Sequence, residues 1–423
     1  MTARATSRLP RRNALLFIFI TVMINMIGFG VLMPVMPKLI MDVTGEGLSA
    51  AAKWGGLLSL AYALMQFVMM PVMGSLSDRF GRRPVLLGSL AAFSLDALLL
   101  AVAPSLSVLF VARILAGTFS ATYSTANAYI ADITPPEKRA ANFGLMGAAF
   151  GLGFIIGPAL GGLIGEEYGH RAPFYAVAGL AFCNFLYGAL VLPETNAVDN
   201  RRKFSWRRAN VFGSFRYFSQ YPSILPIAFA IFLFNIGHWA FPAVWAYFAE
   251  ERFAWTPREI GFSLMAVGLA SAVVQGGLTR IIIPQIGERS AAIGGFAIAI
   301  LAYVAYGLAT EGWMIYATIA VGALSGVSGP ALQGIMSRTV PADAQGQLQG
   351  AMGAITGVSM IIGPLLMTQI FSYFSGAGAV YYLPGAPFLV AATLSSFALL
   401  PLRAAFRRIK RPRPAASADA GLR

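Results

Sequence analysis

The chain has 423 residues, of which 57% are hydrophobic and only 11% are charged, and its formal net charge is +14. Soluble domains carry roughly 25% charged residues, so this composition excludes the soluble classes of protein. Two histidines leave little material for catalysis, and the sequence shows no phosphate-binding loop or metal-ligand cluster. We therefore expect a membrane protein that is not an enzyme and holds no metal or cofactor.

Apolar stretches long enough to cross a bilayer, about 20 residues each, recur along the whole chain. Twelve are predicted, which defines an all-α membrane protein. Their approximate ranges are 14–40, 52–77, 84–102, 106–131, 141–165, 172–192, 223–249, 258–280, 290–309, 313–336, 346–374 and 382–402. The first stretch lacks a small-residue cleavage site and is too long for a signal peptide, so we interpret it as the first membrane helix.

The basic residues are distributed unevenly between the two sides of these spans. Most of the 31 Lys and Arg residues fall in segments that face the cytoplasm if the chain starts there. This bias follows the positive-inside rule and predicts cytoplasmic termini. The basic charge then reflects topology and contact with anionic lipid, and no nucleic-acid partner is expected.

A short, strongly charged stretch joins the second and third spans. Residues 74–83 are Gly-Ser-Leu-Ser-Asp-Arg-Phe-Gly-Arg-Arg, in which the glycines would allow a turn and a close backbone approach. One interpretation is an ordinary cytoplasmic loop anchored by its arginines. The other is a gate formed with the end of the fourth span. The gate residues would be Gly74, Asp78, Arg79, Gly81, Arg82, Arg83 and Asp132.

Polar side chains inside the spans are the candidate site residues, because charges are costly in a bilayer. Asp96 and Arg113 lie at similar depth on adjacent antiparallel helices, as either a structural ion pair or a proton-coupling site. His238 is either a proton relay or a packing histidine. Carboxamides at membrane depth either line the substrate cavity or join helices. They are Asn25, Gln66, Asn127, Asn235, Gln275 and Gln333.

The fifth span contains more small residues than a plain membrane anchor needs. Its pattern consists of Gly153, Gly157, Pro158, Gly161 and Gly162. Small residues at such spacing allow helix backbones to approach closely in a membrane.

The second half of the sequence repeats the first at one constant offset. Residues 147–160 align with 353–366, which predicts two six-helix bundles with a site at their interface. The charged groups of the first half are mostly missing from the second; Asp132, for example, corresponds to Arg338. The predicted divisions are a cytoplasmic basic N-terminus 1–13, an N-terminal bundle 14–192, a cytoplasmic linker 193–222, a C-terminal bundle 223–402 and a cytoplasmic basic tail 403–423.

The pattern of residues 74–83 closely resembles the loop between helices 2 and 3 in the major facilitator superfamily of transporters. From about residue 18 to 400, the sequence also looks like the tetracycline-efflux branch of the twelve-helix drug:proton antiporters. The motifs that carry this resemblance include Gly28-Phe-Gly-Val-Leu-Met-Pro-Val-Met-Pro37, Tyr62-Ala-Leu-Met-Gln66, Ser94-Leu-Asp96, Gly157-Pro158 and Gln345-Gly-Gln-Leu-Gln-Gly350.

The resemblance implies roles for several residues. In that family the aspartate that matches Asp96 and the arginine that matches Arg113 are important for transport, and the charges of the helix 2–3 loop take part in gating. The helix 5 glycine pattern resembles the signature of antiporters and implies export. The resemblance also implies a bacterial inner membrane location, in which the positive-inside bias puts both termini in the cytoplasm.

Three positions depart from the family pattern. The family usually has an aspartate where this chain has Asn25, and a histidine where it has Ser271. It has an aspartate in helix 9, whereas nothing between Arg289 and Glu311 ionises here. In the relatives these groups serve substrate–Mg²⁺ binding and proton coupling. Asp96 is therefore the expected proton carrier.

The sequence thus predicts a secondary active transporter, a proton-coupled antiporter that exports a small amphipathic, tetracycline-like drug by alternating access. The alternatives are export of a non-tetracycline compound, a proton-coupled symporter or uniporter of a metabolite, and a transport-inactive sensor or scaffold. The expected partners are a small-molecule substrate, the proton gradient and membrane lipid, and the protein is expected to be a monomer.

Overall fold

The structure is a computed structural model that describes residues 11–196, 201, 221–341 and 344–408. The described residues form helices and no strands. Among the residues that the structure describes, twelve helical stretches are long and apolar enough to cross a membrane, which confirms the predicted all-α fold. The predicted basic N-terminus, linker and basic tail lie largely outside the described residues.

The first six spans form one group of helices, called here the first helix group. It contains α1 (Arg11–Thr44), α2 (Leu48–Phe80), α3 (Arg82–Val102), α4 (Leu106–Thr118), α5 (Thr122–Ile133), η1 (Pro136–Lys138), α6 (Arg139–Glu167) and α7 (Ala172–Val191). The fourth span consists of α4 and α5, which are separated by a break at residues 119–121.

The last six spans form the second helix group. It contains α9 (Leu225–His238), α10 (Ala240–Phe253), α11 (Pro257–Val273), η4 (Val274–Leu278), α12 (Thr279–Ile286), α13 (Glu288–Leu308), α14 (Gly312–Gly322), η5 (Ala323–Val327), α15 (Ser328–Thr339), α16 (Gln345–Ser375) and α17 (Ala386–Arg408). Three of its spans change helix type or direction part-way, and η4 is a single turn of π-helix.

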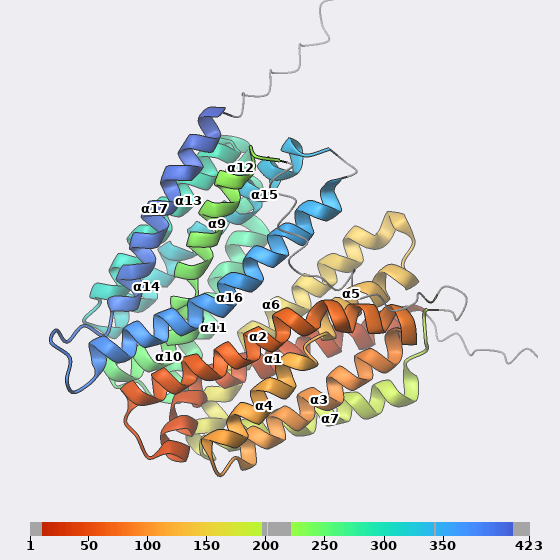
Figure 1. The fold of residues 1–423 in the computed structure, drawn as a ribbon, viewed down its shortest axis with the longest axis horizontal. Helices are drawn as coiled ribbons and strands as arrows, with labels where there is room; N and C mark the ends of the chain where they lie inside the picture. Colours follow the sequence, from red (N-terminus) through yellow and green to blue (C-terminus); the bar gives the residue numbers. More distant parts are fainter. Residues whose placement is uncertain (1–10, 197–200, 202–220, 342–343, 409–423) are drawn as a thin grey trace, which may run out of the picture.

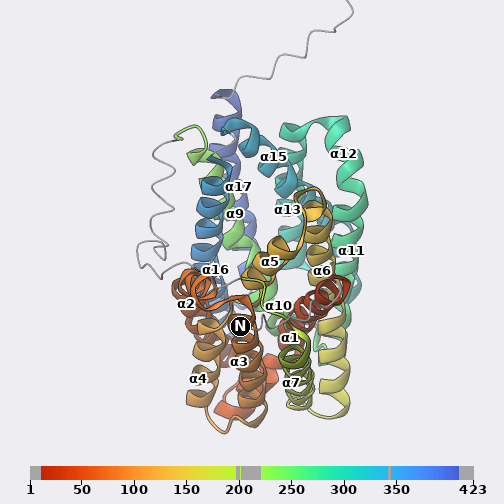
Figure 2. The ribbon, with the colours of Figure 1, turned by 90° about the vertical axis from the view of Figure 1, so that its right-hand side faces the viewer.

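The two groups meet chiefly through two helix pairs, α2 with α16 and α6 with α11 (Figures 1 and 2). The α6–α11 contact is close because glycines of each helix lie against the backbone of the other. A Cβ at Gly162 would lie 2.3 Å from the Pro257 carbonyl oxygen, and one at Gly261 would lie 2.4 Å from that of Pro158. Larger side chains there would push the groups apart.

Within the first group, three glycines of the predicted fifth-span pattern face α1. A Cβ added at Gly153, Gly157 or Gly161 would lie 2.5–2.7 Å from a backbone carbonyl oxygen of α1. The pattern therefore serves close packing on both sides of α6, against α1 through these three residues and against α11 through Gly162.

The buried core is shared between the groups only at the predicted external end. One cluster there combines residues of α1 and α3, such as Leu39 and Leu100, with Trp245 of α10 and Phe388 of α17. At the predicted cytoplasmic end, each group has its own separate cluster. Figure 1 shows the same arrangement, with the helices converging near α10 and diverging toward α5 and α15.

Hydrogen bonds and ion pairs between the two helix groups are distributed in the same way as the shared core. Among the described residues they lie at the predicted external end, where Lys38 forms an ion pair with Glu250 and Ser49 donates to the Ser372 carbonyl oxygen at 2.8 Å. The Glu166 carboxylate also accepts from the backbone of Arg258 at 3.3 Å. The protein is thus joined at one end and open to separation at the other.

Candidate functional site

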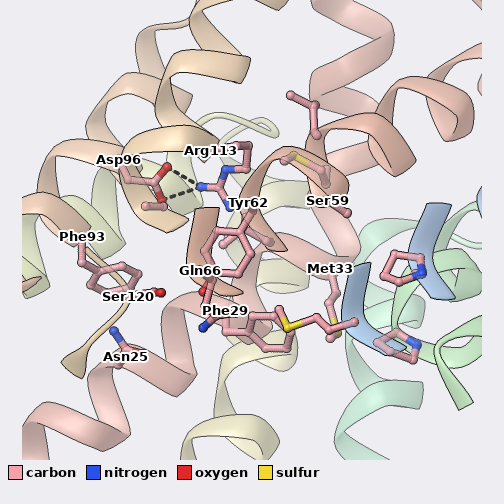
Figure 3. A pocket seen from close by; sticks show the side chains of 18 of the residues that line it. Asn25, Phe29, Met33, Ser59, Tyr62, Gln66, Phe93, Asp96, Arg113 and Ser120 are labelled. Atoms are coloured by element: carbon pink, nitrogen blue, oxygen red, sulfur yellow. Dashed lines mark hydrogen bonds and ion pairs between the residues drawn. The ribbon is translucent and has the colours of Figure 1, made fainter. Parts of the chain in front are cut away.

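A cavity of about 260 Å³ lies between the two helix groups. Its walls come from α1, α2, α3 and the α4–α5 break on one side, and from α10 and α16 on the other. Aromatic and methionine side chains, including Phe29, Met33, Tyr62 and Phe93, make up eleven of the 27 lining residues, and eight others are polar or charged (Figure 3). Such a lining suits an amphipathic ligand held by a small number of polar groups.

Asp96 and Arg113 form an ion pair in the wall of this cavity. Both carboxylate oxygens of Asp96 accept hydrogen bonds from Arg113 Nη2 (Figure 3). The two residues are only 2% and 9% exposed. The sequence could not show whether they face each other, and the structure shows that they do. Pairing keeps both charges compensated where isolated charges would be very unfavourable.

Three buried polar atoms around this pair have no hydrogen-bond partner among the described residues. They are Arg113 Nε, Gln66 Oε1 and Ser89 Oγ, and all three residues line the cavity. Leaving such a group unsatisfied costs about 1–3 kcal/mol, so these atoms are suited to a ligand or water. Ser89 was not predicted, because a serine in an apolar helix carries no distinguishing pattern.

The structure separates the other predicted site residues. Asn25 lines the central cavity, whereas Asn127 lines neither described cavity. His238 lies in the second helix group, where its Nδ1 is 3.2 Å from the Tyr303 hydroxyl and its ring is parallel to that of Phe234. It is not among the residues that line the central cavity with Asp96.

The remaining predicted carboxamides line a second cavity, of about 390 Å³, within the second helix group. Asn235, Gln275 and Gln333 face it together with Gln349, which the sequence had not marked. The predicted carboxamides are therefore divided, with Gln66 and Asn25 in the central cavity, these three in the second cavity and Asn127 in neither.

The charged stretch 74–83 is mostly helical, which corrects the expectation of a loop. α2 continues to Phe80, and only Gly81 breaks the helix, with φ of 111°. A Cβ at Gly74 would meet nothing within 4 Å, so the predicted close approach at this glycine is absent. The guanidinium of Arg79 lies 5.0 Å from the centre of the Phe80 ring.

Arg82 is the centre of the charged contacts at this end. Its guanidinium donates to Asp78 at 2.6 Å and to Asp132 at 3.3 Å, so it joins α2, α3 and α5. The Glu194 carboxylate accepts from the backbone N–H groups of Arg82 and Arg83, at 2.8 and 3.2 Å, and so caps the start of α3. The cap was missed because Glu194 is distant in sequence.

The second helix group contains a counterpart of this contact with the charges exchanged. Glu288 forms an ion pair with Arg338. At the repeat offset these positions correspond to Arg82 and Asp132. One charged contact of the first half therefore has a counterpart in the second, although Asp78 and Arg113 correspond to the uncharged Pro284 and Ile319.

Metal-ligating side chains are not grouped in the part of the chain that the structure describes. No three His, Cys, Asp or Glu residues lie together as a metal site would require. Asp96 is the one carboxylate in the lining of the central cavity, and it is already paired with Arg113.

A cavity between two groups of membrane-length helices is the architecture of a secondary transporter, not of an enzyme. The sequence profile of the Major Facilitator Superfamily matches residues 18–364 and 286–422. The chain therefore belongs to this superfamily.

Individual relatives show a similarity that is more specific than membership of the superfamily. The chain is 42% identical to the class C tetracycline resistance protein of Escherichia coli over 360 residues, which cover 85% of this chain and 90% of the relative. It is 36% identical to the class G tetracycline resistance protein of Vibrio anguillarum over 386 residues, 89% of this chain and 97% of the relative. These matches confirm the resemblance predicted from the sequence.

A solved structure supports the fold. A bacterial homologue of the human lysosomal transporter Spinster, in an inward-facing and unoccupied conformation, matches with a TM-score of 0.77 at 16% identity. The match covers 96% of this chain and all of that one.

Proposed function

We propose that the protein is a proton-coupled antiporter that exports a small amphipathic, tetracycline-like compound by alternating access. The observation that carries this proposal is the buried Asp96–Arg113 pair in the wall of the central cavity. Ionisable groups at membrane depth are features of proton relays and substrate pathways. The compound class comes from the tetracycline resistance proteins among the relatives.

Coupling requires that proton uptake and substrate binding exclude each other at Asp96. A carboxylate has about four acceptor sites, so ionised Asp96 can accept from a donor group of the substrate as well as from Arg113. Protonation of Asp96 removes its negative charge and part of its acceptor capacity, and it leaves the Arg113 charge uncompensated in the cavity wall. Both effects weaken the binding of a substrate that donates a hydrogen bond or carries a positive charge, so the incoming proton releases the substrate.

Alternating access would move the two bundles, residues 14–192 and 223–402, as units. Opening at the external end must break the Lys38–Glu250 ion pair and the bond from Ser49 to Ser372. Closing at the cytoplasmic end would bring the gate around Arg82 toward the start of α16 at Gln345. The open space beside the Gly74 backbone leaves room for that approach.

The glycine pattern of α6 fits the export function as a joint between the moving units. Gly157 packs on α1 and Gly162 on α11, so α6 contacts both helix groups at backbone distance. Helices without side chains at a contact can slide with little steric resistance.

The proposed location is the bacterial inner membrane, with both termini in the cytoplasm, because the basic residues gather at that end. The proposed partners are the substrate, protons and membrane lipid. Nucleic acid has no place in this function, and one chain contains both bundles, so a monomer suffices.

A second candidate is export of an amphipathic compound that is not a tetracycline. The central cavity favours it because its lining offers one carboxylate, Asp96, which is already paired with Arg113. A metal–tetracycline chelate would need oxygen ligands beyond this one.

The test is drug accumulation in efflux-deficient cells. Cells that express the wild type should accumulate less tetracycline than cells expressing Asp96→Asn, and a protonophore should abolish the difference. Ethidium, measured in parallel, separates the two candidates, since export of ethidium without tetracycline favours the second. Equal accumulation of both compounds in all cells would contradict drug export.

A further inference from the structure

The cavity inside the second helix group has a chemistry different from that of the central one. Its lining contains no charged residue among the described side chains. Four carboxamides face it from four elements, Asn235 on α9, Gln275 on η4, Gln333 on α15 and Gln349 on α16. Ser328 and apolar side chains such as Phe234 form the rest of the wall.

These carboxamides do not join the helices to one another. None of the four forms a side-chain hydrogen bond with another described residue, and Gln275, Gln333 and Gln349 are exposed. Gln345 provides the contrast, since its amide donates to the Ser337 carbonyl oxygen at 2.6 Å and joins α15 to α16. Four amides that converge on a cavity without protein partners are available to a ligand.

The helix around Gln275 is irregular where it meets the cavity. η4 is a π-helical turn, and the hydroxyl of Thr279, the residue that follows it, donates to the Val274 carbonyl oxygen at 2.9 Å. π-turns insert one extra residue and are frequent at functional sites. Here the irregular turn contains the residue whose amide faces the cavity.

The repeat offers no counterpart of this cavity. At the repeat offset Asn235, Gln275 and Gln349 correspond to Phe29, Met69 and Phe143, whereas Gln333 corresponds to the carboxamide Asn127. Asn127 lines neither cavity, so three of the four amides, and the gathering of all four on one cavity, belong to the second group.

The carboxamide cavity lies closer to the predicted cytoplasmic end than the ion pair does. Gln333 is about 9 Å from the end of α15 at Thr339, judged from the rise of the helix. Asp96 is about 20 Å from the start of α3 at Arg82 on the same measure. A compound that enters from the cytoplasm would reach the carboxamides first.

We infer that this cavity is a second substrate subsite, which binds the uncharged hydroxyl, keto and amide edge of an amphipathic compound before the compound reaches Asp96. Carboxamides donate and accept without charge, so they match such an edge and have no preference for a simple cation. This inference rests on the proposed export function and adds a recognition step to it.

The test compares two probes, tetracycline and ethidium, by equilibrium dialysis with the purified full-length protein. Tetracycline has a keto, hydroxyl and amide edge, whereas ethidium is a cation without one. Gln275→Leu and Gln333→Leu should each raise the Kd for tetracycline about 2- to 12-fold, the range of one hydrogen bond. The Kd for ethidium should stay within about twofold. Gln285→Leu, at an exposed position of α12 outside both cavities, is the matched control.

Each other outcome contradicts a particular part of the inference. An unchanged Kd for tetracycline in both variants would overturn the subsite while leaving proton-driven export intact. Equal losses for tetracycline and ethidium would show general damage to the protein and would also overturn it. A wild type that binds no tetracycline would refute the ligand chemistry; protonophore-sensitive ethidium export would then show that the proposed antiport itself still holds.

Discussion

The Asp96–Arg113 pair allows its structural and coupling roles to be separated by a double-mutant cycle. The three variants are Asp96→Asn, Arg113→Gln and the combination of both. In the first two, one charge disappears and its partner stays buried, since the residues are 2% and 9% exposed. Removing one member of a buried ion pair costs about 3–5 kcal/mol.

The double variant should recover most of this loss. Two neutral amides leave no uncompensated charge and can donate to and accept from each other, so the charge penalty of the single variants disappears. The measurement is the temperature at which half of the detergent-solubilised protein is no longer monodisperse. This temperature ranks the variants even though unfolding is irreversible. We expect both single variants to fall by several degrees and the double variant to return near the wild type.

Transport then decides between the two roles. If the pair couples protons to export, the double variant is stable but its tetracycline export no longer responds to a protonophore. If the pair is only structural, stability and proton-driven export return together. Recovery of wild-type export in the double variant, or full export by Asp96→Asn alone, would refute the coupling role.

Three further predictions concern the gate and the packing. Glu288→Arg should reduce transport because it places two cations together, and the additional change Arg338→Glu should restore transport. The effects on stability should be about 1 kcal/mol at most, because Arg338 is largely exposed. Unimpaired export by the single variant would show that this contact has no part in the transport cycle. Gly157→Leu should destabilise the protein by about 1–3 kcal/mol or more, because its Cβ would lie 2.5 Å from an α1 carbonyl oxygen. Gly151→Leu is the control in the same thermal assay, because a Cβ there meets open space. Gly81→Ala should cost about 1 kcal/mol or more from its positive φ and its contact with a carboxylate, and a melting temperature equal to that of the wild type would show that the helix break does not need glycine.

The sequence alone determined the membrane class, the twelve spans, the expected orientation and the candidate charges. These properties depend on local composition, because the bilayer selects helices by apolar length and by the sign of flanking charges. The motif-based resemblance to the tetracycline-efflux branch was also available from the sequence, and the relatives confirm it.

Only the tertiary structure decided which of these residues meet. The orientation of each helix about its own axis decides that Asp96 faces Arg113 and that His238 instead contacts Tyr303 in the second helix group. A repeat alignment does not contain this orientation. Contacts between distant segments, such as the Glu194 cap on α3, are likewise invisible to local patterns. Composition determines that a helix lies in the membrane, whereas the packing of its neighbours determines which of its polar side chains share a cavity.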